Sequence, residues 1–432
     1  MNLSIVIMAA GFGTRMKSSL PKVLHPISGH PMLFHILSEA TTLSDDIHVV
    51  LYHEHEAIKA AMASYFEGIT FVLQDHANFP GTGGAIKAAH PKYDTVLVLN
   101  GDMPLVQAST LTPLLNHDVA VVMSVFEARN PFGYGRVVLD ASSNVARVVE
   151  EKDATAQEKA LRTVNAGVYV FQKKFLENAL PNLRNANAQN EYYLTDLVEI
   201  ATSQGEAVKA VMVDEEAFMG VNSKLHLAQA ETAMQQRLRE KWMEEGVSMR
   251  LPQTIFLDAR ARFEGECFLE NGVSILGDST IIASSIKANS VVESSTIVDS
   301  TVGPLARIRP HCHIQDSHLG NFVEVKNSTL KGVKAGHLSY LGDASIDEGT
   351  NVGCGTITCN YDGKAKHRTQ IGKNVFIGSD TQLIAPVVIE DDVLIAAGST
   401  ITQNVPTGAL AISRAKLSIK AGFFHRFFPT KQ

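Results

Sequence analysis

Near the start of the chain, small residues and two cations follow an apolar run in a pattern suited to phosphate. The run Leu3 to Ala10 predicts a buried strand, and the loop after it contains Gly11, Gly13 and Arg15, with Lys22 further along. Small residues let backbone amides approach a triphosphate, and the two cations can offset its charge. The loop matches neither G-x-G-x-x-G nor G-x-x-x-x-G-K-[ST]. A bare glycine turn is the alternative.

A carboxylate follows a second apolar run. Val96 to Asn100 leads directly into Gly101 and Asp102. An oxygen ligand at the tip of a buried strand suits a Mg²⁺ ion that bridges phosphates. An Asp before Met-Pro is also a common turn former.

The first half of the chain alternates short apolar runs with helix-length segments. This alternation favours a mostly parallel, Rossmann-like α/β sheet with ligands at the carboxyl ends of its strands. The expected strands are Leu3 to Ala10, Ile47 to Tyr52, Thr70 to Leu73, Thr95 to Asn100, Val119 to Phe126 and Gly167 to Phe171.

The second half repeats an aliphatic residue every six positions, a period typical of a left-handed parallel β-helix. The repeating positions are Ile286, Val292 and Val298, then Val302, Ile308 and Ile314, then Ile371, Ile377, Leu383, Ile389, Ile395 and Ile401. A solenoid that is purely structural or only oligomerises is the alternative.

Polar segments interrupt this repeat between about residues 318 and 370. A solenoid that only stacks has no need of them. Among them His337 is a plausible base for an amine that attacks a thioester, with Glu324 as an orienting partner. A lone histidine is more often structural.

Residues 223–245 contain neither proline nor glycine and predict one long helix that ends near Gly246. We interpret it as a spacer rather than a catalytic element. Its apolar stripe should rest on a neighbouring surface. The stripe includes Leu227, Ala230, Met234 and Leu238.

Composition limits the remaining possibilities. A chain of 432 residues is too long for one core, and its net charge of -7 argues against nucleic acid as the main ligand. No apolar run is long enough to span a membrane. The four cysteines lack zinc-site spacing and suggest a reducing cytoplasm. We expect a catalytic domain over 1–225, a helical linker over 226–246 and a β-helix domain over 247–432.

The motifs of the first half resemble, in order and spacing, those of the sugar-1-phosphate nucleotidyltransferases. The motifs are Gly11 to Met16, Pro21-Lys22, Gly81 to Gly83, Gly101 to Pro104, Gly133 to Arg136, Glu150 to Lys152, Val164 to Gly167 and Gly220 to Ser223.

The resemblance implies roles for single residues. It implies that Ala9, Ala10, Gly11, Arg15 and Lys22 hold UTP, that Gln74, Gly81 and Thr82 recognise uracil, that Gly135, Glu150 and Asn165 bind the sugar, and that Asp102 and Asn222 ligate Mg²⁺, with Asn222 also close to the nucleotide. One departure bears on base selectivity. The stretch from Gln74 to Gly81 is about two residues longer than usual and lacks the customary second glutamine.

The polar segments of the second half resemble the acetyltransferase domain of the bifunctional N-acetylglucosamine-1-phosphate uridylyltransferases/glucosamine-1-phosphate acetyltransferases. Members of such families pack as trimers, with active sites between subunits. The resemblance implies that His337 is the base, that Arg309, Lys326, Tyr340, Asn351 and Lys366 surround glucosamine 1-phosphate, and that Cys354, Asn360, Tyr361, Ser379, Ala397 and Arg414 lie along acetyl-CoA. Cys354 stands where alanine is common, and its thiol could alter acyl-CoA affinity.

The basic C-terminal stretch, which includes Lys416, Lys420 and Arg426, could meet the phosphates of coenzyme A or could be a solvated tail. Together the two halves predict an enzyme with two reactions, acetylation of glucosamine 1-phosphate and uridylyl transfer from UTP. Two alternatives are a nucleotidyltransferase whose β-helix lacks acyl transfer and a non-catalytic assembly or regulatory subunit. His337 and Asn360-Tyr361 argue against the first alternative, and Arg15, Lys22 and Asp102 argue against the second.

Overall fold

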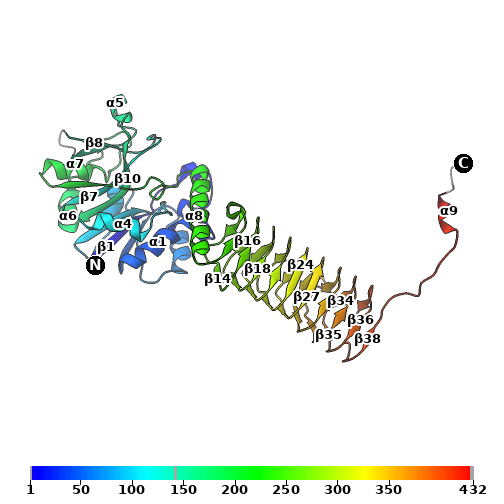
Figure 1. The fold of residues 1–432 in the computed structure, drawn as a ribbon. Helices are drawn as coiled ribbons and strands as arrows, with labels where there is room; N and C mark the ends of the chain where they lie inside the picture. Colours follow the sequence, from blue (N-terminus) through cyan, green and yellow to red (C-terminus); the bar gives the residue numbers. More distant parts are fainter. Residues whose placement is uncertain (1, 141–143, 429–432) are drawn as a thin grey trace. The chain divides into compact units, whose positions relative to one another are not determined.

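The computed structural model describes residues 2–140 and 144–428, and the chain divides into two compact units, Met1–Gln235 and Gln236–Gln432 (Figure 1). The boundary falls inside helix α8, Lys224–Glu244, within the stretch expected as a linker. Across the described ranges, no helix combines the length and the apolar character needed to cross a membrane.

The first unit is built on a nine-stranded mixed sheet. Its main strands lie in the order β11-β7-β10-β6-β1-β4-β5, and only β10 runs against its neighbours in this row. Strands β8 and β9 form an antiparallel extension beside β10. The strands are β1 Leu3–Met8, β4 Asp46–Leu51, β5 Thr70–Leu73, β6 Thr95–Asn100, β7 Val121–Glu127, β8 Arg136–Leu139, β9 Val145–Val149, β10 Thr163–Gln172 and β11 Val208–Met212, with a separate hairpin of β2 Pro26–Ile27 and β3 His30–Pro31.

Helices cover both faces of this sheet, because successive residues of its central strands alternate between two apolar cores. In β1, Ile5 and Ile7 join the core beneath α1, α2 and α4, while Val6 joins the core beneath α3, α6 and α7. The helices are α1 Met32–Leu43, α2 His55–Ala63, α3 Thr82–Ala88, α4 Ala108–Leu115, α5 Ala156–Lys159, α6 Lys173–Ala179 and α7 Asp196–Ser203, with 3₁₀ turns η1 Thr14–Met16, η2 Lys22–Leu24 and η3 Leu180–Asn182. The expected α/β sheet is confirmed.

Helix α8 ends as the sequence predicts. Gly246 has a φ of 98°, its N–H donates to the carbonyl oxygen of Met243, and the N–H of Val247 donates to that of Trp242. These two bonds are the Schellman arrangement that terminates helices. The predicted apolar stripe of α8 packs in two places. Ala230 packs in a core of the first unit, whereas Leu238 packs against the core of the second.

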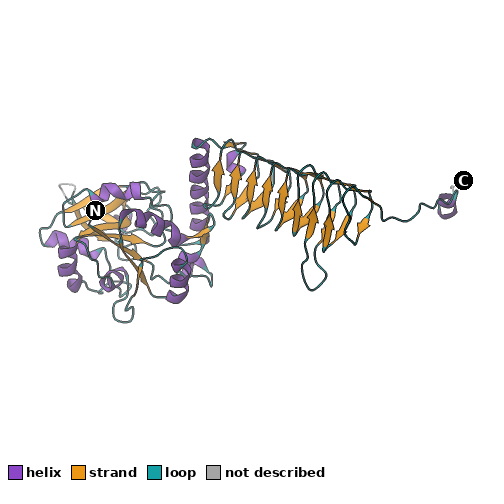
Figure 2. Ribbon diagram, turned by 90° about the horizontal axis from the view of Figure 1, so that it is seen from below, coloured by secondary structure: helices purple, strands orange, loops and turns teal. Residues whose placement is uncertain are grey.

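The second unit is a left-handed parallel β-helix of three sheets, as expected (Figure 2). Within each sheet, neighbouring strands come from successive coils and pair in parallel. The first sheet contains β12 Ser248–Met249, β15 Phe268–Leu269, β18 Ser285–Ile286, β21 Thr301–Val302, β24 His318–Asn321, β27 Lys334–His337, β30 Asn351–Val352, β33 Phe376–Ile377, β36 Leu394–Ile395 and β38 Leu410–Ala411.

The other two sheets complete each coil. The second sheet contains β13 Phe256–Leu257, β16 Ser274–Leu276, β19 Val291–Glu293, β22 Arg307–Ile308, β25 Glu324–Lys326, β28 Tyr340–Gly342, β31 Ile357–Cys359, β34 Gln382–Ile384 and β37 Thr400–Ile401. The third sheet contains β14 Arg262–Glu264, β17 Thr280–Ile282, β20 Thr296–Val298, β23 His313–Gln315, β26 Thr329–Lys331, β29 Ala344–Ile346, β32 Thr369–Ile371 and β35 Val387–Ile389. A 3₁₀ turn, η4 Pro252–Thr254, precedes β13 and a short helix, α9 Phe423–Phe427, follows β38.

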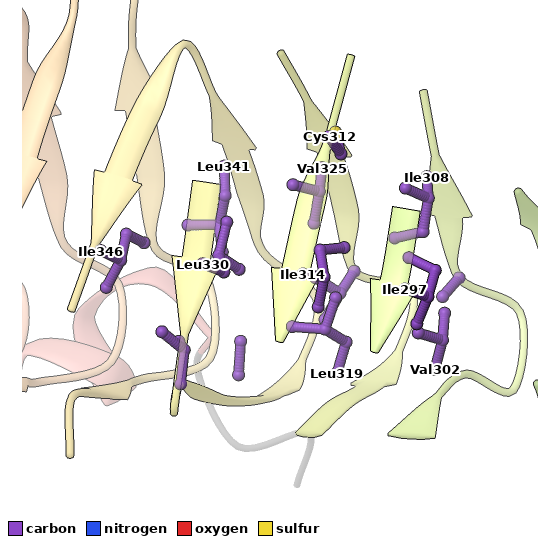
Figure 3. Close-up of a cluster of buried hydrophobic side chains, with 14 of the residues drawn as sticks. Ile297, Val302, Ile308, Cys312, Ile314, Leu319, Val325, Leu330, Leu341 and Ile346 are labelled. Atoms are coloured by element: carbon purple, nitrogen blue, oxygen red, sulfur yellow. The ribbon is translucent and has the colours of Figure 1, made fainter. Parts of the chain in front are cut away.

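Buried side chains, most of them aliphatic, fill the interior of the β-helix, and Figure 3 shows a part of this core. The prediction of Val298 as an inward residue is wrong, because Ile297 is fully buried there and Val298 is half-buried. Several turns advance by five residues instead of six, as from Val292 to Ile297. Steps of six and then five residues likewise separate the buried residues Leu319, Val325 and Leu330. The predicted break over 318–370 therefore narrows to the loop 360–368 between β31 and β32.

Candidate functional site

A cavity of about 400 Å³ opens where β1 and β6 end. Its lining includes eight of the residues expected around UTP and Mg²⁺. They are Ala9, Ala10, Gly11, Lys22, Gln74, Gly81, Thr82 and Asp102. The structure thus brings the glycine-rich loop, the start of α3 and the tip of β6 to one place, as expected at the carboxyl ends of parallel strands.

Lys22 is the central cation of this cavity. Its Nζ lies 2.5 Å from Asp102 Oδ2 and 3.0 Å from Asn222 Oδ1. Arg15 donates to the same amide oxygen of Asn222 at 2.9 Å. Gly13, at φ 63°, makes this approach possible, because a Cβ there would stand 2.7 Å from Lys22 Cβ. Arg15 and Asn222 therefore join the site although they do not line the cavity.

The oxygens of Asp102 and Asn222 converge on one positive charge, with the Lys22 ammonium as a stand-in for a metal ion. A carboxylate and an amide oxygen suit Mg²⁺, which takes its other ligands from substrate phosphates and water. No group of three or more His, Cys, Asp or Glu side chains suited to a metal occurs among the described residues. Asp102 and Asn222 therefore fit a metal ion that takes part of its coordination from a bound phosphate.

The loop after β5 is shaped by Gln74. Its buried Nε2 donates to the carbonyl oxygens of Phe79 and Gly81, both at 2.9 Å. The Thr82 hydroxyl accepts from the backbone N–H of Leu194 at 2.9 Å, which fixes the start of α3. One side of the Gln74 amide is thus committed to holding the long 74–81 loop against the cavity.

The three expected sugar-binding residues gather in a second place. The backbone N–H of Asn165 donates to the Gly135 carbonyl at 2.9 Å. A Cβ on Gly135 would lie 3.5 Å from the Glu150 carboxylate, which accepts a hydrogen bond from Thr195 at 3.1 Å. Burial raises the pKa of Glu150. A carboxyl group in this environment is suited to hydrogen bonding with neutral hydroxyls.

A buried arginine fixes the loop that carries Gly135. Arg136 is 2% exposed, and its Nη2 lies 2.8 Å from Glu151 Oε2. The same carboxylate oxygen accepts from the backbone N–H of Gly133 at 3.1 Å. Glu151 follows Glu150 directly, so this ion pair ties the Gly133–Gly135 loop to the segment that carries Glu150.

In the second unit, three cations gather at the edge of the β-helix. The adjacent ammonium group of Lys366 and then the charge of Arg309 lower the pKa of Lys326. Lys366 belongs to the 360–368 loop, where the backbones of Tyr361 and Lys366 form an isolated antiparallel β-bridge. Cations held this close together are stabilised when an anion such as a phosphate binds between them.

Polar residues adjoin these cations. Asn360 Nδ2 lies 2.5 Å from Asp343 Oδ2 and 3.4 Å from the Tyr340 hydroxyl. Asp343 also raises the pKa of Lys326 slightly through its charge. Tyr340, Asn360, Lys326, Lys366 and Arg309 therefore lie in one neighbourhood of a single chain.

A column of exposed positions runs along one corner of the β-helix. Each member lies two residues after an inward residue, and these inward residues pair in register from coil to coil. The column comprises His337, Cys354, Ser379 and Ala397. Gly378 permits close stacking here, because a Cβ there would stand 2.4 Å from the backbone nitrogen of Ala397.

The column ends at Arg414, whose Nη1 donates to the Ala397 carbonyl at 2.8 Å. Three coil steps of about 4.8 Å make the column about 14 Å long. An extended ligand can thus reach from His337 towards Arg414 along one edge.

Asn351 and Glu324 have surroundings that the sequence did not predict. Asn351 lies on β30, in a different sheet from Lys326 and Tyr340. Glu324 forms its ion pair with Arg309 at 3.0 Å and has no hydrogen bond to His337 in the described part of the chain. The idea that Glu324 orients His337 is therefore unsupported.

Sequence reasoning missed several residues of the first site. Phe12 and His76 line the cavity, and Thr195 holds Glu150. Phe12 stands inside the glycine-rich motif and His76 inside the stretch from Gln74 to Gly81, and these positions were a usable signal. Thr195 belongs to none of the motifs, so the sequence carried no such signal for it.

Comparisons with known proteins agree with this arrangement. The MobA-like NTP transferase domain matches residues 5–164, and six repeats of the bacterial transferase hexapeptide match residues 368–403. The bifunctional protein GlmU of Nitratiruptor sp. is 60% identical over 99% of both chains, and that of Aliarcobacter butzleri is 58% identical over 99% of both. The bifunctional protein GlmU of Wolinella succinogenes is 59% identical over the full length of both chains. The chain therefore belongs to the GlmU family of bifunctional proteins.

Proposed function

We propose that this chain catalyses two successive transfers. The second unit moves the acetyl group of acetyl-CoA to the amine of glucosamine 1-phosphate. The first unit then transfers UMP from UTP to N-acetylglucosamine 1-phosphate, forming UDP-N-acetylglucosamine and releasing pyrophosphate. The observation that carries the proposal is that one chain contains both the Lys22, Asp102 and Asn222 cluster and the His337 column.

In uridylyl transfer, a phosphate oxygen of the sugar phosphate attacks the α-phosphorus of UTP. That oxygen is already ionised near neutral pH, so the site needs no general base. Arg15 and Lys22 offset the negative charge, while Gly135, Glu150 and Asn165 hold the sugar in line. Asp102 and Asn222 would hold Mg²⁺, which supplies further charge neutralisation when bound.

In acetyl transfer, the amine must lose a proton before it attacks the thioester carbonyl. His337 accepts that proton, and the proton that the nitrogen loses after the attack goes to the departing sulfur, so coenzyme A leaves as the thiol. Arg309, Lys326 and Lys366 bind the sugar phosphate, and Tyr340 adjoins it. Cys354, Asn360, Tyr361, Ser379, Ala397 and Arg414 lie along acetyl-CoA.

A homotrimer completes the acetyl-transfer site in this proposal. Asn351 and His337 lie on the first sheet, whereas Lys326 and Tyr340 lie on the second. A site shared between neighbouring β-helices would let Asn351 of one chain serve the phosphate cluster of another. The four free cysteines support a location in the cytoplasm. The domains follow as 1–225, a helical linker over 226–246 and 247–432.

The experiment that tests this function is an omission series. Purified full-length protein is incubated with glucosamine 1-phosphate, acetyl-CoA, UTP and Mg²⁺, and each component is left out in turn. We expect UDP-N-acetylglucosamine only from the complete mixture, with N-acetylglucosamine 1-phosphate accumulating when UTP is omitted. Formation of UDP-glucosamine without acetyl-CoA, as fast as the complete mixture forms UDP-N-acetylglucosamine, would refute the order of the two steps.

A further inference from the structure

Four aromatic rings meet at the rim of the nucleotide cavity. Phe12 comes from the glycine-rich loop, Tyr52 and His53 follow β4, and His76 belongs to the 74–81 loop. The ring centroid of Phe12 lies 5.6 Å from that of Tyr52, 5.4 Å from His53 and 5.5 Å from His76. Three separate segments thus support one phenylalanine.

The support has a definite geometry. Tyr52 and His76 stack in parallel with centroids 4.5 Å apart. Phe12 stands nearly perpendicular to both rings, at interplanar angles of 81° and 90°. Edge-to-face contacts of this kind stabilise a ring in one orientation. The stacked pair therefore holds the Phe12 ring in place.

Phe12 itself remains uncovered. It is 51% exposed and lines the same cavity as Gln74, Gly81 and Thr82. An oriented aromatic face beside a group of polar recognition residues is suited to a flat, partly polar ligand. A nucleobase meets both requirements, since each base has an aromatic face that stacks and a polar edge.

The ring cluster also bears on the departure in the 74–81 loop. That loop lacks a second glutamine, and the amide nitrogen of Gln74 is committed to Phe79 and Gly81. Fewer polar groups are therefore available to bind the base. Stacking would add affinity without adding selectivity, because all bases stack.

We propose that Phe12 stacks on the uracil of UTP, with Tyr52 and His76 as positioning residues for the Phe12 ring. The proposal rests on the proposed uridylyl transfer. It assigns base affinity to Phe12 and leaves discrimination between bases to the polar groups near Gln74.

The test compares ligands with and without a base. UTP, CTP and ribose 5-triphosphate, which has no base, are titrated into full-length wild-type protein and the Phe12→Ala variant in the presence of Mg²⁺, with calorimetric detection. We expect Phe12→Ala to weaken UTP and CTP by about the same factor, on the order of tenfold. Ribose 5-triphosphate should bind both proteins equally, which also shows that the variant is folded around the phosphate loop.

Further variants sharpen the test. Phe12→Tyr should restore UTP affinity to within about twofold of wild type, because it retains the ring. His76→Ala should weaken UTP more than ribose 5-triphosphate, which a general loss of structure would not do. Phe376→Ala removes a phenylalanine of matched exposure, 52%, from the other unit and should change none of the three affinities.

Two results would overturn the stacking role. One is an unchanged affinity of Phe12→Ala for UTP, and the other is an equal loss for ribose 5-triphosphate, which would make Phe12 a part of the phosphate loop only. Failure of the proposed function is distinguishable, because the wild-type protein would then form no UDP-N-acetylglucosamine from UTP.

Discussion

Asp102 and Asn222 come from distant parts of the chain, yet both contact the Lys22 ammonium. The second unit shows a different arrangement, since Lys326 lies beside Lys366 and near Arg309, which is paired with Glu324. One cation with two oxygen partners and a group of three neighbouring cations favour different ligands. The first suits a metal-bound triphosphate and the second suits a simple phosphate.

In the proposed acetyl transfer, His337 acts as the base. Because the amine of glucosamine 1-phosphate must lose a proton, His337→Ala should lower the acetylation rate by about 10²- to 10⁴-fold. Uridylyl transfer should stay at the wild-type rate. Coenzyme A release measures the first reaction and pyrophosphate release the second. His313→Ala, a change at another exposed histidine of the β-helix, serves as the control. Retention of more than about a tenth of the acetylation rate in His337→Ala would make His337 a binding residue.

Asp196 gives the first unit a pH-dependent stability. Burial, together with the charges of Glu199 and Glu150, raises the pKa of Asp196 from 3.8 to about 6. The folded state then holds this proton more tightly than the unfolded state does. This contribution therefore stabilises the fold as pH falls from about 6 towards 4 and is lost as pH rises through about 6.

Asp196→Asn should remove this dependence. At pH 7.5 we expect the variant to gain on the order of 1 kcal/mol, a value discounted for the partial exposure of the carboxyl. Calorimetry of the full chain, followed at the transition that UTP shifts, measures the effect. The exposed Asp118→Asn should leave the dependence unchanged. If the stability of Asp196→Asn fell between pH 4 and pH 6 as steeply as that of the wild type, this assignment would be ruled out.

At the scale of elements, one ion pair couples the two segments that we propose bind the sugar. Arg136, at the start of β8, and Glu151, just after β9, connect Gly135 to Glu150. Because Arg136 is buried, the pair holds a defined geometry instead of a mobile surface contact. We interpret Arg136 and Glu151 as positioning residues.

Glu151→Gln should therefore raise the KM for N-acetylglucosamine 1-phosphate by about five- to tenfold while the KM for UTP stays the same. Steady-state kinetics with each substrate varied in turn separates the two constants. Glu177→Gln removes the surface pair with Lys173 and should alter neither KM. Equal increases of both KM values would indicate general loosening of the first unit.

The sequence predicted most elements because their apolar periods are regular. Strands β5 and β6 have the expected ends, and every predicted inward residue of the β-helix except Val298 is buried. Strands β8 and β9 were missed, because these short antiparallel strands lack a long apolar run. The five-residue turns were missed. Their corner residues Ser294, Asp299 and Asn327 have a left-handed backbone, but six-residue turns have such corners too, as at Leu305, so the corners do not reveal the shorter step.

The candidate sites show the same limit. Motif order placed Gly11, Lys22, Asp102 and Thr82 around one cavity correctly. Contacts between side chains of different motifs could not be predicted from motif order, because the partner of a side chain depends on three-dimensional packing. The pairing of Glu324 with Arg309, the Arg136–Glu151 pair and the ring cluster at Phe12 belong to this class.

At the scale of the whole molecule, each unit contains a complete core and its own group of functional residues. No residue of the Lys22 cluster belongs to the β-helix core, and helix α8 contributes apolar side chains to both units. The central claim is therefore that one chain carries two chemically independent sites.

Asp102→Ala tests this claim most directly, with both reactions measured on the same purified full-length protein. Loss of the carboxylate removes an expected metal ligand and the partner of Lys22, so uridylyl transfer should fall by at least about 100-fold. Acetyl transfer should remain within about twofold of the wild-type rate, because the His337 column and the three-cation cluster are untouched. A folded Asp102→Ala protein that loses both activities to the same extent would contradict the account.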